Sequence, residues 1–263
     1  MLSVRDLEVR FTDRREVDEA VRGVSFDMAP GEILGIVGES GSGKSVTARA
    51  IMGLLRRRSA QVSGQILFGE QNLLALSIEE MRKLQGKRIS MVFQEPKSAL
   101  NPLMKVGRQV EEGLRLHSGI SKSERKARAI EVMTDMELAD PARVYDQYPH
   151  ELSGGMRQRA MLAAALITEP ELLICDEPTT ALDVRTQTQI LALLQKVREE
   201  RGMGILFISH DLQVIRSICR RAIVMQDGRI VEQGDVEALF TTPKEAYTKR
   251  LLDSIPGRGR QRG

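Results

Sequence analysis

Hydrophobic and polar residues alternate with two different periods along this chain, and these periods predict where its strands and helices lie. In residues 24–28 apolar side chains occupy every second position, and residues 4–11 come close to the same period. This spacing predicts β-strands near the N-terminus. Short runs that are apolar throughout are typical of strands buried in a parallel sheet. Such runs lie at 33–37, 172–175 and 205–208, and further strands are predicted at 65–68, 88–93, 222–225 and 229–231.

Apolar residues at helical spacing predict a second set of elements. Ser121 and Glu124 have the spacing of a capping box that opens one of these helices. Between residues 96 and 166 the strand signal disappears, so a purely helical block interrupts an α/β chain and predicts an inserted subdomain. Asp227-Gly228 is typical of a hairpin turn between the last two predicted strands. The predicted helices cover residues 45–55, 105–117, 121–137, 153–167, 185–200, 211–220 and 243–255.

The composition narrows the functional classes that this pattern leaves open. With 263 residues, 41% hydrophobic and 29% charged, the chain has the make-up of a soluble globular protein. It has no Trp and 3% aromatic residues, which argues against base-stacking platforms, and a net charge of +3 is too small to imply a nucleic-acid partner. Cys175 and Cys219 are expected to be reduced core residues. No secretion signal and no apolar run near the roughly 20 residues of a membrane span is apparent, so we expect any span to come from another chain.

Residues 38–45 carry the strongest chemical signal, because they match G-x-x-x-x-G-K-[ST] between a predicted strand and a predicted helix. Glycines allow backbone N–H groups to face an anion, and the helix N-terminus adds partial positive charge. Lys44 can reach the β- and γ-phosphates, and the Ser45 hydroxyl can ligate Mg²⁺. The predicted nucleotide-binding residues are Gly38, Glu39, Ser40, Gly41, Ser42, Gly43, Lys44, Ser45 and Val46.

Candidate catalytic groups follow the predicted buried strands. Asp176 and Glu177 end the run at 172–175; in a phosphate-loop enzyme the first carboxylate holds Mg²⁺ and the second polarises the attacking water. An isolated acidic pair is commonplace in a solvated turn, and it is the upstream phosphate loop that favours the functional interpretation. His210 follows a strand at the sheet edge where α/β proteins bind ligands, which suggests a γ-phosphate sensor. Gln94, at the end of the strand predicted at 88–93, could offer its amide oxygen to Mg²⁺ or to the attacking water, and spacing alone leaves open whether it has this role.

A second glycine-bearing helix start lies at residues 152–155, which read Leu-Ser-Gly-Gly. Ser153 can cap the helix, while Gly154 and Gly155 expose backbone N–H groups. As an isolated pattern, Ser-Gly-Gly is more often a flexible turn.

Taken together, these motifs resemble the ATP-binding cassette (ABC) family over residues 2 to about 234. The resemblance implies a single phosphate-loop ATPase domain of the α/β class over residues 1–263. Residues 1–95 and 167–235 would form the core with an N-terminal β subdomain, 96–166 the inserted α-helical subdomain, and 236–263 a short C-terminal extension. ATP and Mg²⁺ are the implied ligands. Glu177, His210 and Gln94 would be catalytic, and Ser45, Gln94 and Asp176 would bind the metal.

The resemblance also implies a head-to-tail dimer, with each ATP between one subunit's phosphate loop and the other's Ser153-Gly154-Gly155. Asp183, in the Ala-Leu-Asp at 181–183, would lie at the dimer seam. Phe11 falls at the position that often carries a Tyr stacking on adenine in this family.

Residues 93–102, 148–159 and 247–256 are similar to the peptide/nickel importer branch of the family. This implies an ATPase subunit of a di- or oligopeptide importer at the cytoplasmic face of the inner or plasma membrane. Its partners would be two permease subunits, an extracytoplasmic solute-binding protein and a second cassette. Pairing with a different cassette is favoured over pairing with a second copy of this chain. No nucleic-acid partner is expected. Some relatives carry a cysteine-rich extension for an iron–sulfur cluster; this chain has no Cys after Cys219, so we predict no cluster.

Several alternatives remain at this stage. The transported solute could be nickel or another small solute, because importers of these solutes use the same type of ATPase. Within the family, the nearest alternative to an importer subunit is an exporter subunit. A soluble ABC ATPase acting on DNA would need long coiled coils between Lys44 and Asp176, and this stretch has no sustained heptads. Ribosomal members usually carry two cassettes in one chain. A non-hydrolysing cassette is disfavoured because Glu177 and His210 are in place.

Overall fold

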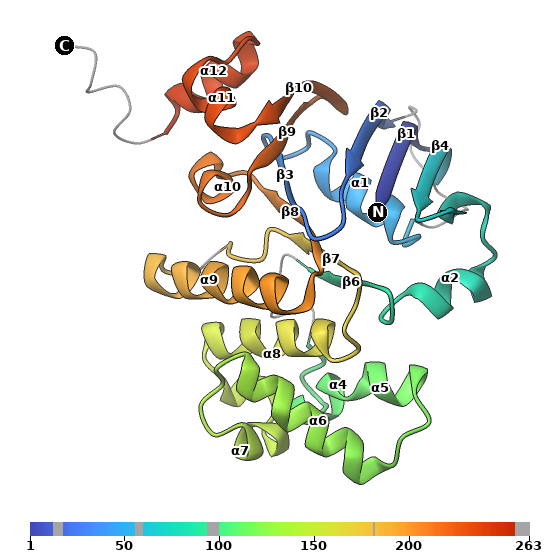
Figure 1. Ribbon diagram of the computed structural model, residues 1–263, viewed down its shortest axis with the longest axis vertical. Coiled ribbons are helices and arrows are strands. Elements are labelled where there is room, and N and C mark those ends of the chain that lie inside the picture. The colour runs from blue at the N-terminus through green and yellow to red at the C-terminus, as the bar shows by residue number, and fades with distance from the viewer. Residues whose placement is uncertain (13–17, 56–59, 94–99, 181, 256–263) are drawn as a thin grey trace. The chain divides into compact units, whose positions relative to one another are not determined.

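The computed structural model describes residues 1–12, 18–55, 60–93, 100–180 and 182–255. They fall into two compact units, one formed by Met1–Met81 with Gly204–Gly263 and the other by Arg82–Met203 (Figure 1). The predicted division of the domain into core, helical insertion and C-terminal extension remains a prediction. No helix among the described residues is long and apolar enough to cross a bilayer.

An antiparallel sheet forms one layer of the first unit, with strand order β2-β1-β4-β5. The alternation that predicted its first strands is seen in their burial, since Val4, Leu7 and Val9 are completely buried while their neighbours are partly or fully exposed. The strands are β1 (Leu2–Phe11), β2 (Asp18–Met28), β4 (Ala60–Phe68) and β5 (Gln71–Asn72), followed by the 3-10 helix η1 (Leu73–Ala75) and α2 (Ile78–Leu84).

The second sheet of this unit is built on β3 (Ile33–Val37), all five residues of which are buried, as the apolar run predicts. β3 pairs in parallel with β8 (Gly204–Ser209) and β9 (Arg221–Gln226), and β9 pairs antiparallel with β10 (Arg229–Asp235). The turn between β9 and β10 has positive φ at both Asp227 (49°) and Gly228 (77°), which explains why Asp-Gly marks this hairpin. The helices of the unit include α1 (Lys44–Ile51), α10 (Leu212–Ile218), α11 (Val236–Thr241) and α12 (Ala246–Asp253).

The second unit consists mainly of helices, which surround buried residues of α6 and α8 such as Val132, Met133 and Leu162. The capping box predicted from Ser121 and Glu124 is confirmed, because each residue's side chain accepts from the other's backbone N–H. Figure 1 shows α4 to α8 gathered together. The elements are β6 (Ile89–Val92), α4 (Val106–Val110), α5 (Glu112–His117), α6 (Lys122–Asp135), α7 (Pro141–Asp146), η2 (Pro149–Glu151), α8 (Gly154–Leu166), β7 (Leu172–Asp176) and α9 (Val184–Arg201).

Two predicted helices differ from the structure. The helix expected over 45–55 ends at Ile51, because Gly53 adopts φ 64° and its N–H and that of Leu54 return to helix carbonyls. The helix expected over 105–117 is divided into α4 and α5 at Glu111, whose buried side chain bonds to Tyr145 and Arg108. The short helices α7 and α11 were not predicted from the hydrophobic pattern, although the N-cap residues Asp140 and Asp235 begin them.

Candidate functional site

The predicted phosphate loop connects β3 to α1 in the first unit, and its glycines are needed for close backbone approaches. A Cβ on Gly38 would lie 2.2 Å from the Met225 carbonyl oxygen, and one on Gly43 would lie 2.6 Å from that of Ala20. Real Cβ atoms do not come so close to backbone atoms, so a side chain at either position would displace the loop. The loop also contains Gly41 at φ 83°. The sequence therefore forms a tight cradle at the start of a helix.

Lys44 begins α1, and its side chain curls back over this cradle. The residue is 4% exposed, and its Nζ donates hydrogen bonds to the carbonyl oxygens of Gly38 and Glu39 at 2.7 Å and to Ser42 Oγ at 3.3 Å. A buried ammonium held over a glycine loop suits phosphate, because phosphate oxygens can replace carbonyls as acceptors of charged hydrogen bonds. Ser45, the next residue, is half-buried at the same helix end.

Two neighbouring segments brace the loop. The Gly228 N–H donates to the Ser42 carbonyl at 3.1 Å, and the Gly228 carbonyl accepts from the Arg22 N–H at 2.8 Å. The β9–β10 hairpin therefore holds the loop through a backbone hydrogen bond, and β2 in turn holds the hairpin. Phe11 ends β1 and pairs with Asp18 of β2, close along that strand to Ala20, against which the loop packs. This places Phe11 on the strand pair beside the cradle, while its contact with adenine remains a prediction.

His210 lies at the same edge of the sheet as the loop. Val37 and Ser209 are partners in the parallel β3–β8 pair, so Gly38 and His210 follow paired residues at the carboxyl ends of both strands. His210 is exposed, and the turn that carries it is fixed by the next residue, whose N–H donates to Ser209 Oγ at 2.9 Å. That residue, Asp211, also caps α10. The first unit thus brings the phosphate loop and His210 to one edge.

The acidic pair lies in the second unit. Asp176 is the last residue of β7 and is 1% exposed, whereas Glu177 is partly exposed and adopts the left-handed φ of 50°. Thr180 Oγ1 donates to Glu177 Oε2 at 3.0 Å and helps to orient this carboxylate. The turn gives the two acids different environments, as the sequence suggested. β6 runs parallel to β7, but Gln94, which would follow it, lies outside the described residues.

The segment Ser153-Gly154-Gly155, here called the signature, and Asp183 both approach Thr186 within the second unit. Ser153 caps α8 by accepting from the Met156 N–H at 3.3 Å, and a Cβ on Gly155 would lie 3.0 Å from Thr186 Cγ2. Asp183 caps α9 by accepting from Thr186 through its N–H at 2.9 Å and its Oγ1 at 2.7 Å. These hydrogen bonds lower the pKa of Asp183 and favour its ionised form. Gly154 has open space at its Cβ position, so its backbone is accessible.

The structure divides the predicted residues between its units. The phosphate loop, Phe11 and His210 belong to the first unit; Ser153, Gly154, Gly155, Asp176, Glu177 and Asp183 belong to the second. Tyr247, to which the sequence assigned no site role, also touches the loop. The Tyr247 hydroxyl of α12 accepts a hydrogen bond from the Glu39 N–H at 3.0 Å. No local pattern could identify this contact, because 208 positions separate the two residues.

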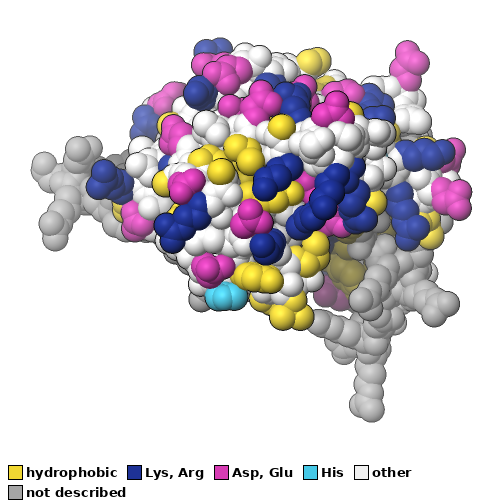
Figure 2. Space-filling model, turned by 90° about the horizontal axis from the view of Figure 1, so that it is seen from below, with side chains coloured by type: hydrophobic (Ala, Val, Ile, Leu, Met, Phe, Trp, Pro, Cys, Tyr) yellow, Lys and Arg dark blue, Asp and Glu magenta, His cyan; other side chains and the backbone are white. Residues whose placement is uncertain are grey.

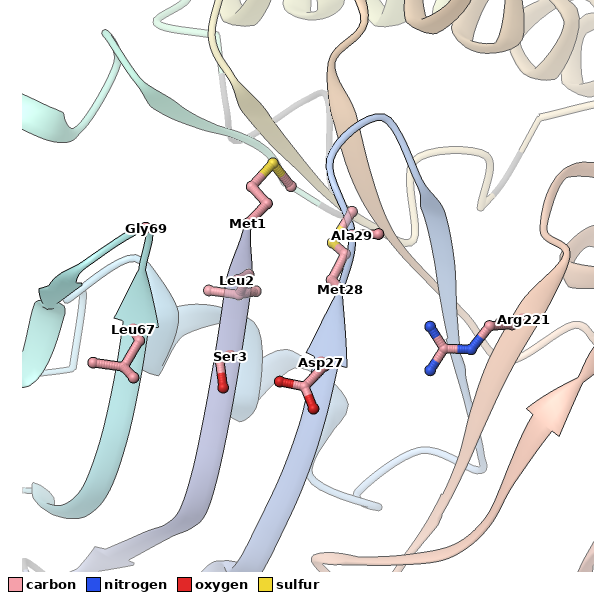
Figure 3. Close-up of a pocket in the computed structure, with 9 residues that line it drawn as sticks. All are labelled: Met1, Leu2, Ser3, Asp27, Met28, Ala29, Leu67, Gly69 and Arg221. Atoms are coloured by element: carbon pink, nitrogen blue, oxygen red, sulfur yellow. The ribbon is translucent and has the colours of Figure 1, made fainter.

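A shallow pocket elsewhere in the first unit contains none of the predicted site residues. It has a volume of about 300 Å³ and lies among the ends of β1, β2 and β4, with Arg221 of β9 on one side (Figure 3). Asp27 at its rim is 61% exposed and pairs with Arg5, whose hydrogen bonds lower the Asp27 pKa. We assign this pocket no role.

The face seen in Figure 2 carries Lys and Arg side chains among Asp and Glu side chains, with hydrophobic side chains between them. A nucleic-acid interface would instead gather basic side chains in a stripe or patch. The absence of a nucleic-acid partner remains a prediction.

Comparison with known proteins agrees with the geometry. A family model described as ABC transporter matches residues 21–180. The chain is 49% identical to a probable peptide ABC transporter ATP-binding protein of Sinorhizobium fredii, over 100% of this chain and 78% of that protein. It is 47% identical to a dipeptide transport ATP-binding protein of Bacillus subtilis, over 97% of this chain and 77% of the other. A peptidoglycan transport ATP-binding protein of Agrobacterium fabrum is 49% identical, over 97% of this chain and 47% of its own length.

Solved structures share the fold. A dimeric ATP-binding cassette in a post-hydrolysis state, bound to ADP and Pi, superposes with a TM-score of 0.81 at 30% identity. The match covers 90% of this chain and 99% of that one. The expected phosphate-loop α/β architecture is therefore confirmed.

Proposed function

Because this chain belongs to the ABC transporter family, we propose that its ATPase activity powers a multi-subunit importer of di- or oligopeptides. The observation that carries the proposal is the glycine cradle with the Lys44 ammonium 2.7 Å from two of its carbonyl oxygens. Relatives named for peptide and dipeptide transport support the choice of solute.

We assign nucleotide binding to the cradle. Its backbone N–H groups, the N-terminus of α1 and Lys44 would bind the phosphates, and Phe11 would stack on adenine. Ser45, Asp176 and Gln94 would hold Mg²⁺, which when bound neutralises charge on the phosphates. The loop fits a phosphate chain because the Lys44 ammonium lies 2.7 Å from the carbonyl oxygens of Gly38 and Glu39 at the start of a helix, where phosphate oxygens can replace these acceptors.

Hydrolysis would depend on Glu177 and His210. Glu177 would accept a proton from the attacking water as a bond forms to the γ-phosphorus and the bond to the ADP oxygen breaks. His210 would hold the γ-phosphate. Ser153, Gly154 and Gly155 would bind the ATP of a second cassette, with Asp183 at the seam. ATP binding would then close the cassette pair, and hydrolysis would reset it.

The remaining partners follow from this assignment. A subunit of this type works with two permease subunits, and we propose an extracytoplasmic solute-binding protein and a second, distinct cassette. The chain would act at the cytoplasmic face of the membrane. Because one relative is named for peptidoglycan transport, a peptidoglycan-derived solute is the second candidate.

The nucleotide assignment is tested by titrating purified chains with a fluorescent ATP analogue and measuring phosphate release. Lys44→Ala should weaken binding at least about tenfold, because it removes a charged partner of the phosphates. Glu177→Gln should bind normally and lose most turnover. Lys122→Ala, a change of the same charge at an exposed position, is the matched control and should behave as wild type. Unchanged affinity in Lys44→Ala would contradict the site, and near-normal turnover in Glu177→Gln would remove Glu177 from its role.

The solute is tested in cells that lack this chain. They should lose uptake of a labelled di- or tripeptide and keep uptake of nickel. The opposite result would favour the nickel alternative.

A further inference from the structure

The C-terminal helix α12 contacts the phosphate loop through one side chain. Tyr247 is 6% exposed, and its hydroxyl oxygen accepts a hydrogen bond from the backbone N–H of Glu39 at 3.0 Å. Glu39 is the second residue of the loop. The contact therefore joins the part of the chain nearest its C-terminus to the part proposed to bind phosphate.

The Gly38–Glu39 peptide group is held at both ends. Its N–H is bound by Tyr247, and its carbonyl oxygen, which belongs to Gly38, accepts from Lys44 Nζ at 2.7 Å. A peptide group is planar, so the direction of its N–H fixes the direction of its carbonyl. The Tyr247 hydroxyl and the Lys44 ammonium thus bind opposite ends of the same rigid peptide group. The orientation that Tyr247 gives this group therefore determines where the Gly38 carbonyl oxygen, the acceptor for Lys44, lies.

The position of Tyr247 is itself fixed by the way α12 begins. The Glu232 carboxylate of β10 accepts from the N–H groups of Lys244 and Glu245 at 2.9 and 3.2 Å, just before the helix. On the helix, Leu251 and Leu252 are buried. The helix is therefore held at its start by hydrogen bonds and along its length by packing, which leaves the Tyr247 ring little freedom.

We propose that Tyr247 is a positioning residue for the phosphate loop. By orienting the Gly38–Glu39 peptide group it holds the Lys44 ammonium over the cradle before nucleotide arrives, and so raises nucleotide affinity. This inference rests on the proposed nucleotide site. It predicts an effect on binding, whereas a tyrosine that only packs would affect stability alone.

Tyr247→Phe tests this directly, since it keeps the ring and removes the hydroxyl acceptor. The loss of one neutral hydrogen bond should weaken Mg-ATP binding about two- to tenfold. The KM for ATP should rise by the same factor, while kcat stays within about twofold because Tyr247 does not touch the reacting atoms. Tyr145→Phe is the matched control: it removes a buried hydroxyl that donates to Glu111 at 2.9 Å in the other unit, and it should lower stability without changing the affinity.

A second readout uses the tyrosine content of the chain, which has three Tyr and no Trp. Labelling with 3-fluorotyrosine should give three fluorine resonances, and the one missing from Tyr247→Phe identifies Tyr247. Adding Mg-ADP to the wild type should shift this resonance, because phosphate draws Lys44 away from the shared peptide group.

The outcomes separate this inference from the proposed function. Suppose that the wild type binds nucleotide, that Lys44→Ala binds it at least about tenfold more weakly, that Tyr247→Phe binds it as tightly as the wild type, and that the Tyr247 resonance of the wild type does not shift; the positioning role is then wrong and the site stands. If the wild type binds no nucleotide, both are wrong.

Discussion

At the residue scale, the buried hydroxyl of Tyr145 shows how the second unit depends on single polar contacts. Tyr145 is 4% exposed, and its hydroxyl donates to the carboxylate of Glu111, which is 1% exposed. Arg108 donates to the other carboxylate oxygen at 2.8 Å. A buried carboxylate is tolerated only when its oxygens have such partners. The three residues therefore form a unit in which the loss of one partner leaves a buried charge poorly compensated.

This arrangement predicts a stability change at alkaline pH. Burial, followed by the hydrogen bond to Glu111, raises the pKa of Tyr145 to about 12. In the unfolded chain a tyrosine ionises near its usual pKa of about 10. The contribution of the neutral Tyr145 hydroxyl to the free energy of unfolding is thus complete below pH 10. It is lost between about pH 10 and 12, because the unfolded state then gives up a proton that the folded state retains.

Denaturant unfolding of the wild type and of Tyr145→Phe at a series of pH values measures this effect. The free energy of unfolding of the wild type should fall more steeply between pH 10 and 12 than that of the variant. Equal slopes would mean that Tyr145 ionises in the folded protein at its ordinary pKa.

At the element scale, α4 and α7 pack so closely that one position admits only glycine. A Cβ on Gly107 of α4 would lie 2.0 Å from the Tyr145 ring of α7. No side chain can be accommodated there unless the ring moves, and the ring is tied to Glu111. The glycine therefore sets the distance between the two helices, although glycine disfavours a helix interior.

Gly107→Ala should lower the free energy of unfolding by about 1–3 kcal/mol, the usual cost of overpacking, despite the better helix propensity of alanine. Thermal or denaturant unfolding measures it. Gly119→Ala is the control, because that position has ordinary φ and open space around its Cβ, and it should not lower stability. A Gly107→Ala protein as stable as the wild type would show that the helices separate easily.

The elements also show which parts of the structure local sequence determines. The strands β1, β3 and β8, the capping box of α6 and the Asp-Gly hairpin follow from period, burial and turn chemistry, all of which lie within a few residues. The side-chain contact of Glu111, where a predicted helix is divided, does not, because its partner Tyr145 lies 34 positions away. The residues of the candidate site also fall into those that local sequence identifies and those that it does not. The phosphate loop, the acidic pair and His210 are local motifs, whereas the Tyr247 contact arises only from the folded arrangement of distant segments.

At the scale of the whole molecule, the predicted ATP-binding residues are distributed over two units, and the signature is proposed to serve a second cassette. A solved relative of this fold is described as dimeric with ADP and Pi bound. Under the proposed function one chain would provide two half-sites, and the chain that completes each of them has to be identified by experiment. Sequence resemblance favours pairing with a different cassette.

The solution mass of Glu177→Gln with and without Mg-ATP tests this pairing. With slow hydrolysis, a chain able to pair with itself would accumulate as an ATP-bound dimer. We expect it to bind ATP and stay monomeric, and to dimerise only when the second cassette is added. Glu177→Gln combined with Lys44→Ala is the control, since it should neither bind ATP nor dimerise. A shift of Glu177→Gln alone from monomer to dimer on adding Mg-ATP, absent from this control, would show that two copies build both sites and would overturn the proposed pairing with a distinct partner.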